Sequence, residues 1–132
     1  MSKHILLIDD QPDLLRLMRM LLEDEHYQVS VLERGSEAVE RVRENPPDLI
    51  VLDLRLPDAS GVDILEGLRS QESTAEIPII VYTAAPLAAE SVANLIEGNP
   101  GRYGNTSVLQ KPFELEALLG RVQQVLGVAP TL

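Results

Sequence analysis

The sequence contains no cysteine. This absence excludes a disulfide framework, a thiolate nucleophile and a cysteine-ligated zinc site. It also fits a reducing compartment, so we expect a cytoplasmic protein. No apolar run approaches the length of a membrane-spanning helix. The amino terminus runs directly into a short strand-like segment and lacks the longer apolar stretch of a signal peptide. We therefore expect no membrane association.

Basic residues are scarce as well. The chain has 11 lysines and arginines against 21 aspartates and glutamates, which gives a formal net charge of −10. A protein that holds the phosphate backbone of a nucleic acid needs a basic surface. We therefore expect no direct nucleic acid binding. The acidic balance is compatible with a site that gathers divalent cations, although we expect most of the carboxylates on the solvated surface.

A chain of 132 residues is long enough for one domain with its own core. Its 45% apolar content is ordinary for a globular protein. We find no internal repeat, low-complexity segment or linker. The expected organisation is one domain over residues 1–127, followed by a short carboxy-terminal tail at residues 128–132.

Strand and helix patterns alternate five times along the chain. The segments typical of strands are residues 5–8, 27–31, 48–53, 77–82 and 106–110. Helical patterns begin near residues 12, 36, 61, 88 and 113. This alternation predicts an α/β fold in which helices cover both faces of a parallel sheet. Residues 101–105 have the composition of an exposed loop.

The first helix carries more apolar residues than one narrow stripe can hold. Helical spacing predicts a core face formed by Leu14, Leu17, Met18 and Leu21. Three further residues lie outside that stripe: Leu15, Met20 and Leu22. They either widen the core face or form an exposed patch for a partner helix.

Chemically active residues gather where the predicted strands end. Asp9 and Asp10 follow the first strand, and Asp53 ends the third, which is otherwise apolar. Thr83 follows the fourth strand and Lys111 the fifth. Taken singly, each could be an ordinary cap, turn or surface residue. Because parallel strands end at one edge of a sheet, where ligands of such sheets bind, we expect all five residues to meet there.

This set of residues suits phosphoryl transfer. Three crowded carboxylates repel one another, and each would be costly to ionise without a cation. Oxygen ligands of this kind suit Mg²⁺, which also retains several waters and takes a phosphate oxygen. We expect Asp53 to be the nucleophile that attacks phosphorus. Mg²⁺ and Lys111 would neutralise the phosphoryl oxygens, and Thr83 would donate a hydrogen bond to one of them.

These motifs, in this order, resemble the receiver domain of two-component response regulators. The matching segments are Ile8-Asp9-Asp10, Asp53-Leu54-Arg55-Leu56-Pro57-Asp58-Ala59-Ser60-Gly61, Tyr82-Thr83-Ala84 and Lys111-Pro112-Phe113. The resemblance covers essentially the whole chain. It implies a single flavodoxin-like, doubly wound sheet of five parallel strands in the order 2-1-3-4-5, flanked by five helices.

The resemblance also implies a role for each site residue. Asp53 would be the phosphoacceptor, and Asp10 would bind Mg²⁺ directly, with Asp9 acting largely through water. The backbone carbonyl of Arg55 would be a further metal ligand. Thr83 would move toward the phosphoryl group, and Lys111 would pair with it.

The implied partner is a sensor histidine kinase or a histidine phosphotransfer protein. Phosphorylation would switch a protein-interaction surface, and a homodimer could form through the face made by residues 88–97, residues 106–110 and the last helix. Such a domain assists only its own phosphorylation and dephosphorylation, so we do not expect an independent enzyme.

The sequence departs from the family pattern in two places. Val108 stands where receivers usually carry a tyrosine or phenylalanine that swings inward with the threonine, and valine is too small and stiff for that movement. The interval between Thr83 and Lys111 is also longer than usual, with the surplus in residues 98–105. Tyr103, in that surplus, either replaces the missing aromatic side chain or belongs to a tolerated insertion.

Two other functions are compatible with parts of this sequence. The chain could be a receiver-like interaction module that signals without phosphorylation, an interpretation motivated by Val108 and the lengthened segment. It could also be a phosphatase that forms an aspartyl phosphate. Such enzymes typically carry a second aspartate two residues after the nucleophile, where this chain has Arg55, and 132 residues leave no room for a cap domain.

Overall fold

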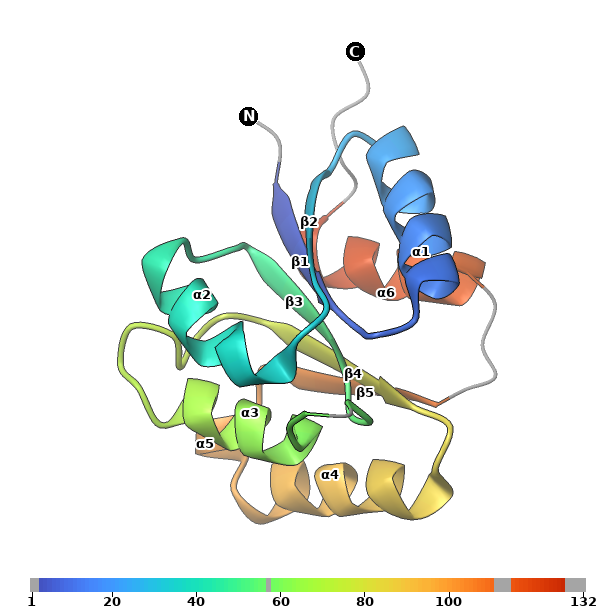
Figure 1. Cartoon of the computed structure of the whole chain (residues 1–132). Helices are drawn as coiled ribbons and strands as arrows, with labels where there is room; N and C mark the ends of the chain where they lie inside the picture. Colours follow the sequence, from blue (N-terminus) through green and yellow to red (C-terminus); the bar gives the residue numbers. More distant parts are fainter. Residues whose placement is uncertain (1–2, 57, 111–114, 128–132) are drawn as a thin grey trace.

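The protein forms a five-stranded parallel sheet between two layers of helices (Figure 1). A computed structural model describes residues 3–56, 58–110 and 115–127. The strands are β1 (His4–Ile8), β2 (Gln28–Leu32), β3 (Leu49–Asp53), β4 (Ile79–Thr83) and β5 (Thr106–Gln110). They lie in the order β2-β1-β3-β4-β5, and every neighbouring pair is parallel. The predicted doubly wound, flavodoxin-like sheet is confirmed.

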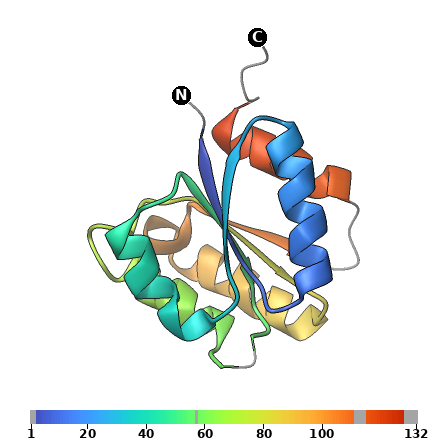
Figure 2. The ribbon, with the colours of Figure 1, turned by 45° about the horizontal axis from the view of Figure 1, so that its top comes forward.

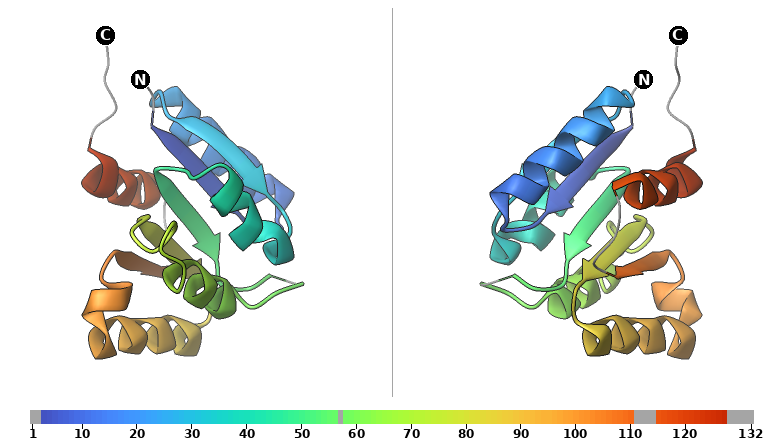
Figure 3. Two further views of the ribbon diagram at one scale, coloured as in Figure 1. Left: turned by 90° about the vertical axis from the view of Figure 1, so that its left-hand side faces the viewer. Right: turned by 90° about the vertical axis from the view of Figure 1, so that its right-hand side faces the viewer.

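The helices divide between the two faces of the sheet. They are α1 (Pro12–Asp24), α2 (Ala38–Glu44), α3 (Gly61–Arg69), α4 (Pro86–Gly98), α5 (Pro100–Tyr103) and α6 (Leu115–Leu126), with a 3-10 turn η1 (Gly35–Glu37) before α2. Figures 2 and 3 show α1 and α6 on one face and α2, α3 and α4 on the other. Two separate clusters of buried residues fill the spaces between the sheet and these layers.

The two clusters follow from the alternation of side chains along each strand. In β1, Ile5 and Leu7 face α1 and α6, whereas Leu6 and Ile8 face the opposite layer. All five residues of β3 are buried. Burial of a large aliphatic side chain contributes about 1.5–3 kcal/mol to the free energy of folding. The central strands are therefore stable elements that position the loops at their carboxyl ends.

The core face of α1 differs from the prediction. Leu15, Met18 and Leu22 are buried, whereas Leu17 is 51% exposed and Met20 is 57% exposed. The prediction was therefore wrong for Leu17, which was assigned to the core. Leu15 and Leu22 belong to the core, as the first alternative proposed, and only Met20 fits the alternative of an exposed patch. Apolar residues occupy both sides of the true stripe, so helical spacing alone left its phase ambiguous.

The segment expected to be an exposed loop at residues 101–105 begins within a short helix, α5. The side chain of Asn99 caps this helix by accepting a hydrogen bond from the backbone N–H of Arg102, at 3.2 Å. Tyr103 is only 6% exposed and packs into the cluster beneath α4. The described residues therefore contain six α-helices where five helices were expected. In the additional helix, α5, Tyr103 is the buried residue. Within the same residues, no helix is both long and apolar enough to cross a bilayer.

Candidate functional site

Three aspartates meet at the carboxyl end of the sheet. Ile8, the last residue of β1, lies opposite Leu52 in the neighbouring strand β3. Asp9 therefore follows β1 at the level where Asp53 ends β3. One carboxylate oxygen from each of Asp9, Asp10 and Asp53 can be chosen so that all three lie within 4.8 Å of one another. Asp9 and Asp53 are buried, whereas Asp10 is exposed. The cluster is therefore anchored in the core and open to solvent on one side.

The loop after β3 holds Asp53 from one side. The backbone N–H of Arg55 donates to Oδ1 of Asp53 at 2.9 Å. The loop closes where the N–H of Gly61 donates to the carbonyl of Leu54, at 3.2 Å. A Cβ atom at residue 61 would lie 2.4 Å from the Cα of Leu54, a distance that real side chains do not reach. Glycine is required there because the start of α3 lies directly against the end of β3.

Asp58 ties the same loop to the rest of the fold. Its two carboxylate oxygens accept hydrogen bonds from the backbone N–H groups of Gly35 and Ser36, at 3.0 and 3.1 Å. These bonds, led by the one from Ser36, lower the pKa of Asp58 below its ordinary value. The loop that carries Arg55 is thus fastened to the turn at η1.

Asp9 is fully buried and is held by two neutral donors. The backbone N–H of Gln11 donates to its Oδ1 at 2.9 Å, and the hydroxyl of Tyr82 donates to its Oδ2. Burial, followed by the negative charge of Asp9, raises the pKa of Tyr82 far above its ordinary value. The Tyr82 hydroxyl therefore stays protonated and remains a donor. The sequence places Tyr82 in a strand and in the matching segment Tyr82-Thr83-Ala84 but assigns no role to its hydroxyl. The one available signal was a phenol directly after three aliphatic strand residues.

Thr83 ends β4 on the other side of Asp53. Its side chain is fully buried, and its Oγ1 accepts a hydrogen bond from the backbone N–H of Ala85 at 3.1 Å. Thr83 pairs in register with Gln110, the last residue of β5. Lys111, the remaining predicted site residue, lies outside the described residues.

The two departures from the family pattern lie on one face of the sheet. Val108 is partly buried and packs against the cluster beneath α2, α3 and α4. Tyr103 joins the same cluster three positions before β5 begins. Because β4 and β5 are parallel, with Ile79 opposite Thr106, Tyr103 lies toward the amino end of the sheet, away from Thr83. This placement favours a structural insertion over a replacement for the missing aromatic side chain.

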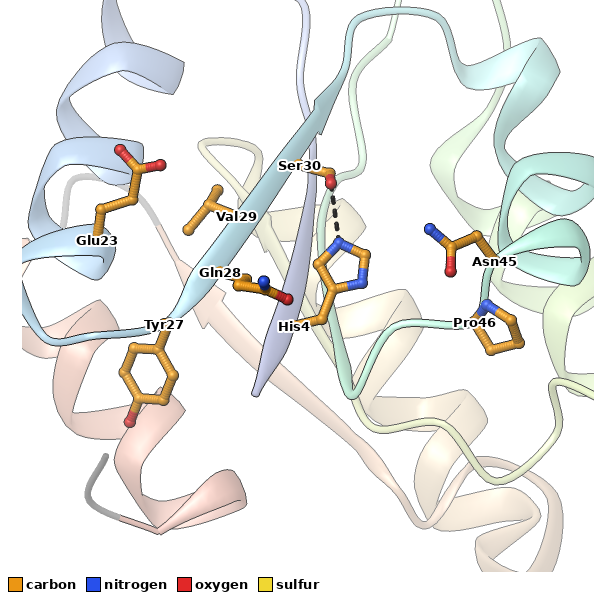
Figure 4. A pocket seen from close by; sticks show the side chains of 8 residues that line it. All are labelled: His4, Glu23, Tyr27, Gln28, Val29, Ser30, Asn45 and Pro46. Atoms are coloured by element: carbon orange, nitrogen blue, oxygen red, sulfur yellow. Dashed lines mark hydrogen bonds between the residues drawn. The ribbon is translucent and has the colours of Figure 1, made fainter. Parts of the chain in front are cut away.

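Two surface depressions lie at opposite ends of the sheet. One, of about 610 Å³, borders Asp10 and the loop after β3, including Arg55 and Ser60. The larger, of about 1080 Å³, lies at the amino end, where Nε2 of His4 is 2.8 Å from Oγ of Ser30 (Figure 4). Ligands of open parallel sheets bind beyond the carboxyl ends of the strands. Of these two depressions, the one beside Asp10 lies at the aspartate cluster.

The donor set of the cluster fits a magnesium ion. Asp9, Asp10 and Asp53 supply hard carboxylate oxygens. The chain has no cysteine, so methionine is its only sulfur-containing residue. Mg²⁺ prefers a few carboxylates with several retained waters. The exposure of Asp10 leaves room for those waters.

Comparison with known proteins agrees with this geometry. Residues 5–123 match the family described as the response regulator receiver domain. The chain is 35% identical over 126 residues to the response regulator ArlR of Staphylococcus saprophyticus, and 34% identical over 127 residues to ArlR of Staphylococcus aureus. These matches cover 96% of this chain but only 53% and 54% of the relatives. The chain thus spans about half the length of the curated relatives it matches.

Solved structures show the same fold. The chemotaxis protein CheY4 of Vibrio cholerae superposes with a TM-score of 0.79 at 26% identity, covering 96% of this chain and all of that one. The receiver domain of a sensor histidine kinase from Pseudomonas aeruginosa superposes with a TM-score of 0.74 at 27% identity, covering 96% of this chain and 99% of that one. That structure has a magnesium ion coordinated in its active-site cleft. The chain belongs to the response regulator receiver domain family and is a signalling domain of the two-component type.

Proposed function

We propose that Asp53 accepts a phosphoryl group at the carboxyl end of this sheet. The observation that carries the proposal is the convergence of the carboxylates of Asp9, Asp10 and Asp53 to within 4.8 Å. Asp53 is 3% exposed and is oriented by the N–H of Arg55. A partly desolvated, fixed carboxylate beside a cation site suits attack on phosphorus.

Asp9, Asp10, Asp53 and the backbone carbonyl of Arg55 would hold Mg²⁺, with Asp9 acting largely through water. When bound, the cation would neutralise charge on the phosphoryl oxygens. The Asp53 carboxylate forms a bond to phosphorus as the bond from phosphorus to the donor's imidazole nitrogen breaks, and the electron pair leaves with that nitrogen. The product is an acyl phosphate on Asp53 and a free histidine on the donor.

Thr83 and Lys111 would receive the new phosphoryl group. Oγ1 of Thr83 accepts a hydrogen bond from Ala85, and a hydroxyl that accepts such a bond still has its own proton to donate. A small movement of Thr83 would direct that proton to a phosphoryl oxygen. The Lys111 ammonium would supply the positive charge. Phosphorylation adds about −1.5 to −2 charges, which biases the surface formed by α4, β5 and α6.

The phosphodonor would be a sensor histidine kinase or a histidine phosphotransfer protein, and the switched surface would serve a partner or a second copy of the chain. In this proposal residues 1–127 are a cytoplasmic receiver domain and residues 128–132 a short tail. The domain binds no nucleic acid itself and catalyses only its own phosphorylation and dephosphorylation. The phosphorylation-independent interaction module has less support, because the acidic cluster and Thr83 are both in place.

Phosphorylation by a small phosphodonor tests this proposal. The wild-type chain is incubated with acetyl phosphate and Mg²⁺, and the intact mass is measured. We expect a gain of one phosphoryl group that requires Mg²⁺ and disappears in Asp53→Asn. Asp63→Asn is the matched control, since Asp63 is an exposed acidic residue in the first turn of α3. An unmodified wild type, or an adduct that persists in Asp53→Asn, contradicts the proposal.

A further inference from the structure

Tyr82 links two strands that are not neighbours. It is the penultimate residue of β4, and β3 lies between β4 and β1 in the sheet. Its backbone is paired with Asp53 in β3, and its ring is fully buried in the cluster beneath α1 and α6. From there its hydroxyl donates to Oδ2 of Asp9, just beyond the end of β1. The side chain therefore reaches across the central strand to the acidic cluster.

The carboxylate of Asp9 is fixed at both of its oxygens. Oδ1 accepts from the backbone N–H of Gln11, at the start of α1, and Oδ2 accepts from Tyr82, at the end of β4. Because the donors come from two different elements, they restrict both the position of the carboxylate and its rotation about the Cβ–Cγ bond. The restricted carboxylate is the one that shares a cluster with Asp10 and Asp53.

We propose that Tyr82 is a positioning residue of the cation site, whose hydroxyl orients Asp9 toward Asp10 and Asp53 and thereby raises the affinity of the cluster for Mg²⁺. The inference rests on the proposed function, in which Asp9 takes part in holding that cation. Asp9 would act on the cation largely through water, so its orientation sets where that water is held. Removal of the hydrogen-bonding partners around a metal site typically weakens metal binding 10- to 100-fold.

The position of the hydroxyl separates this role from simple packing. The ring of Tyr82 fills a fully buried position that phenylalanine would fill equally well. A buried hydroxyl is unfavourable unless it is hydrogen-bonded, and this one is directed at an acidic site residue. Tyr27 provides the contrast within the same cluster, because its hydroxyl donates to the backbone carbonyl of Gly127, away from the aspartates.

Magnesium titration of Tyr82→Phe tests the proposal, with Tyr27→Phe as the matched control. Each variant removes one hydroxyl that donates a hydrogen bond from a buried tyrosine. Binding of MgCl₂ is followed by NMR through the amide of Gln11, whose N–H donates to Asp9. We expect Tyr82→Phe to bind Mg²⁺ about 10-fold more weakly or worse, and Tyr27→Phe to match the wild type. Equal or tighter binding by folded Tyr82→Phe overturns the proposal.

A Mg²⁺ titration of the wild-type chain tests the same role without depending on whether a variant folds. The chain has three tyrosines, so their ring resonances are readily assigned in a tyrosine-labelled sample. Mg²⁺ should shift the ring signals of Tyr82 with the same binding curve as the Gln11 amide, while those of Tyr27 and Tyr103 stay in place. Ring signals of Tyr82 that do not respond to Mg²⁺ contradict the role assigned to its hydroxyl.

Phosphorylation kinetics separate this inference from the proposed function. In Tyr82→Phe, the Mg²⁺ concentration for half-maximal reaction with acetyl phosphate should rise, while the rate at saturating Mg²⁺ returns to the wild-type value. A wild type that is phosphorylated on Asp53, together with unchanged Mg²⁺ dependence in Tyr82→Phe, overturns only the role of Tyr82. Weaker Mg²⁺ binding by Tyr82→Phe in a chain that is never phosphorylated overturns only the proposed function.

Discussion

Asp58 shows how a residue outside the aspartate cluster shapes the site. It is exposed, yet both of its oxygens accept backbone hydrogen bonds from the turn at η1. Those bonds fasten the loop in which the backbone N–H of Arg55 donates to Asp53. The anchor depends on the charge of the Asp58 carboxylate, because a protonated carboxyl accepts such bonds more weakly.

This anchor should depend on pH. The pKa of Asp58 is lowered in the folded chain by its backbone hydrogen bonds, first of all that from Ser36. A lowered pKa means that the stabilisation is complete above the unfolded-state value of about 3.9 and is lost as pH falls through the lower, folded-state pKa. We expect the amide signals of Gly35 and Ser36 to move together in an acid NMR titration with a midpoint below that value. Asp58→Asn should abolish this shared titration. A midpoint above the unfolded-state pKa would contradict the lowered pKa of Asp58.

The site residues that could be identified from sequence were those at which an apolar strand pattern is interrupted or ends. Asp9, Asp10 and Asp53 interrupt or follow apolar strands, and such interruptions are visible without a structure. Tyr82 could not be recognised in this way, because an aromatic residue is ordinary in a strand. Its contact with Asp9 crosses an intervening strand and depends on the sheet order and on side-chain direction. Local sequence patterns show neither the order of the strands nor the direction of this side chain.

At the scale of elements, Arg69 joins the end of α3 to the amino ends of β4 and β5. It is 4% exposed and donates to the carbonyls of Ala75, Ile77 and Asn105 and to Oγ1 of Thr106, at 2.6 to 3.1 Å. Burial lowers the pKa of Arg69, and the negative charge of Glu76 opposes that shift. Its guanidinium donates to the carbonyls of Ala75 and Ile77 and adds a second donor to the carbonyl of Asn105, which also accepts from the N–H of Ile79.

Loss of Arg69 should destabilise the fold without touching the acidic cluster. Arg69→Met keeps much of the side-chain volume but removes the donor to the carbonyls of Ala75 and Ile77. A buried group left without a partner costs about 1–3 kcal/mol. We expect the free energy of unfolding to fall by about 2–4 kcal/mol in urea denaturation. Arg41→Met, at an exposed position of α2, should change it by less than about 0.5 kcal/mol. Equal effects of the two substitutions would show that the hydrogen bonds of Arg69 carry little stability.

The existence and type of most elements could be predicted, whereas the core face of α1 and the existence of α5 could not. The predicted core stripe of α1 was shifted because seven of its residues are leucine or methionine on overlapping faces, and only the sheet decides which of them is covered. The helix α5 was missed because Pro100 and Gly101 are typical of loops. Its formation depends on the Asn99 cap and on the burial of Tyr103 beneath α4, and both are tertiary effects.

At the scale of the whole molecule, negative charges repel one another most closely at the aspartate cluster, where a bound cation would reduce the repulsion. The net charge is −10, and three of the carboxylates converge at one edge of the sheet. Their mutual repulsion opposes folding in the absence of a cation. The same cluster is therefore unfavourable for stability and favourable for ligand binding, as is common at functional sites.

Magnesium should therefore raise the thermal stability of the whole domain. A ligand that binds only the folded state at about 100 times its dissociation constant contributes about 2.7 kcal/mol, which corresponds to a rise of several degrees in Tm for a chain of this size. Asp10→Asn should abolish this rise and should itself be more stable than the wild type without Mg²⁺. Asp13→Asn, at an exposed position in the first turn of α1, should keep it. A shift that persists in Asp10→Asn, with ionic strength matched, would point to a nonspecific salt effect.

The sheet order, the alternation of elements and the edge that carries the site are properties of the whole chain, and they followed from its periodicity and from the family resemblance. The central claim is narrower, because it concerns one carboxylate. Asp53 must carry the phosphoryl group, and the other members of the cluster must not.

Borohydride trapping tests that claim most directly. Acetyl phosphate and Mg²⁺ are added to the wild-type chain, the acyl phosphate is reduced with borohydride, and the peptides are mapped by mass spectrometry. The account predicts that the reduced residue, homoserine, is found at position 53 and nowhere else. Reduction at Asp9 or Asp10, or no reduced residue at all in a chain that binds Mg²⁺, would contradict it.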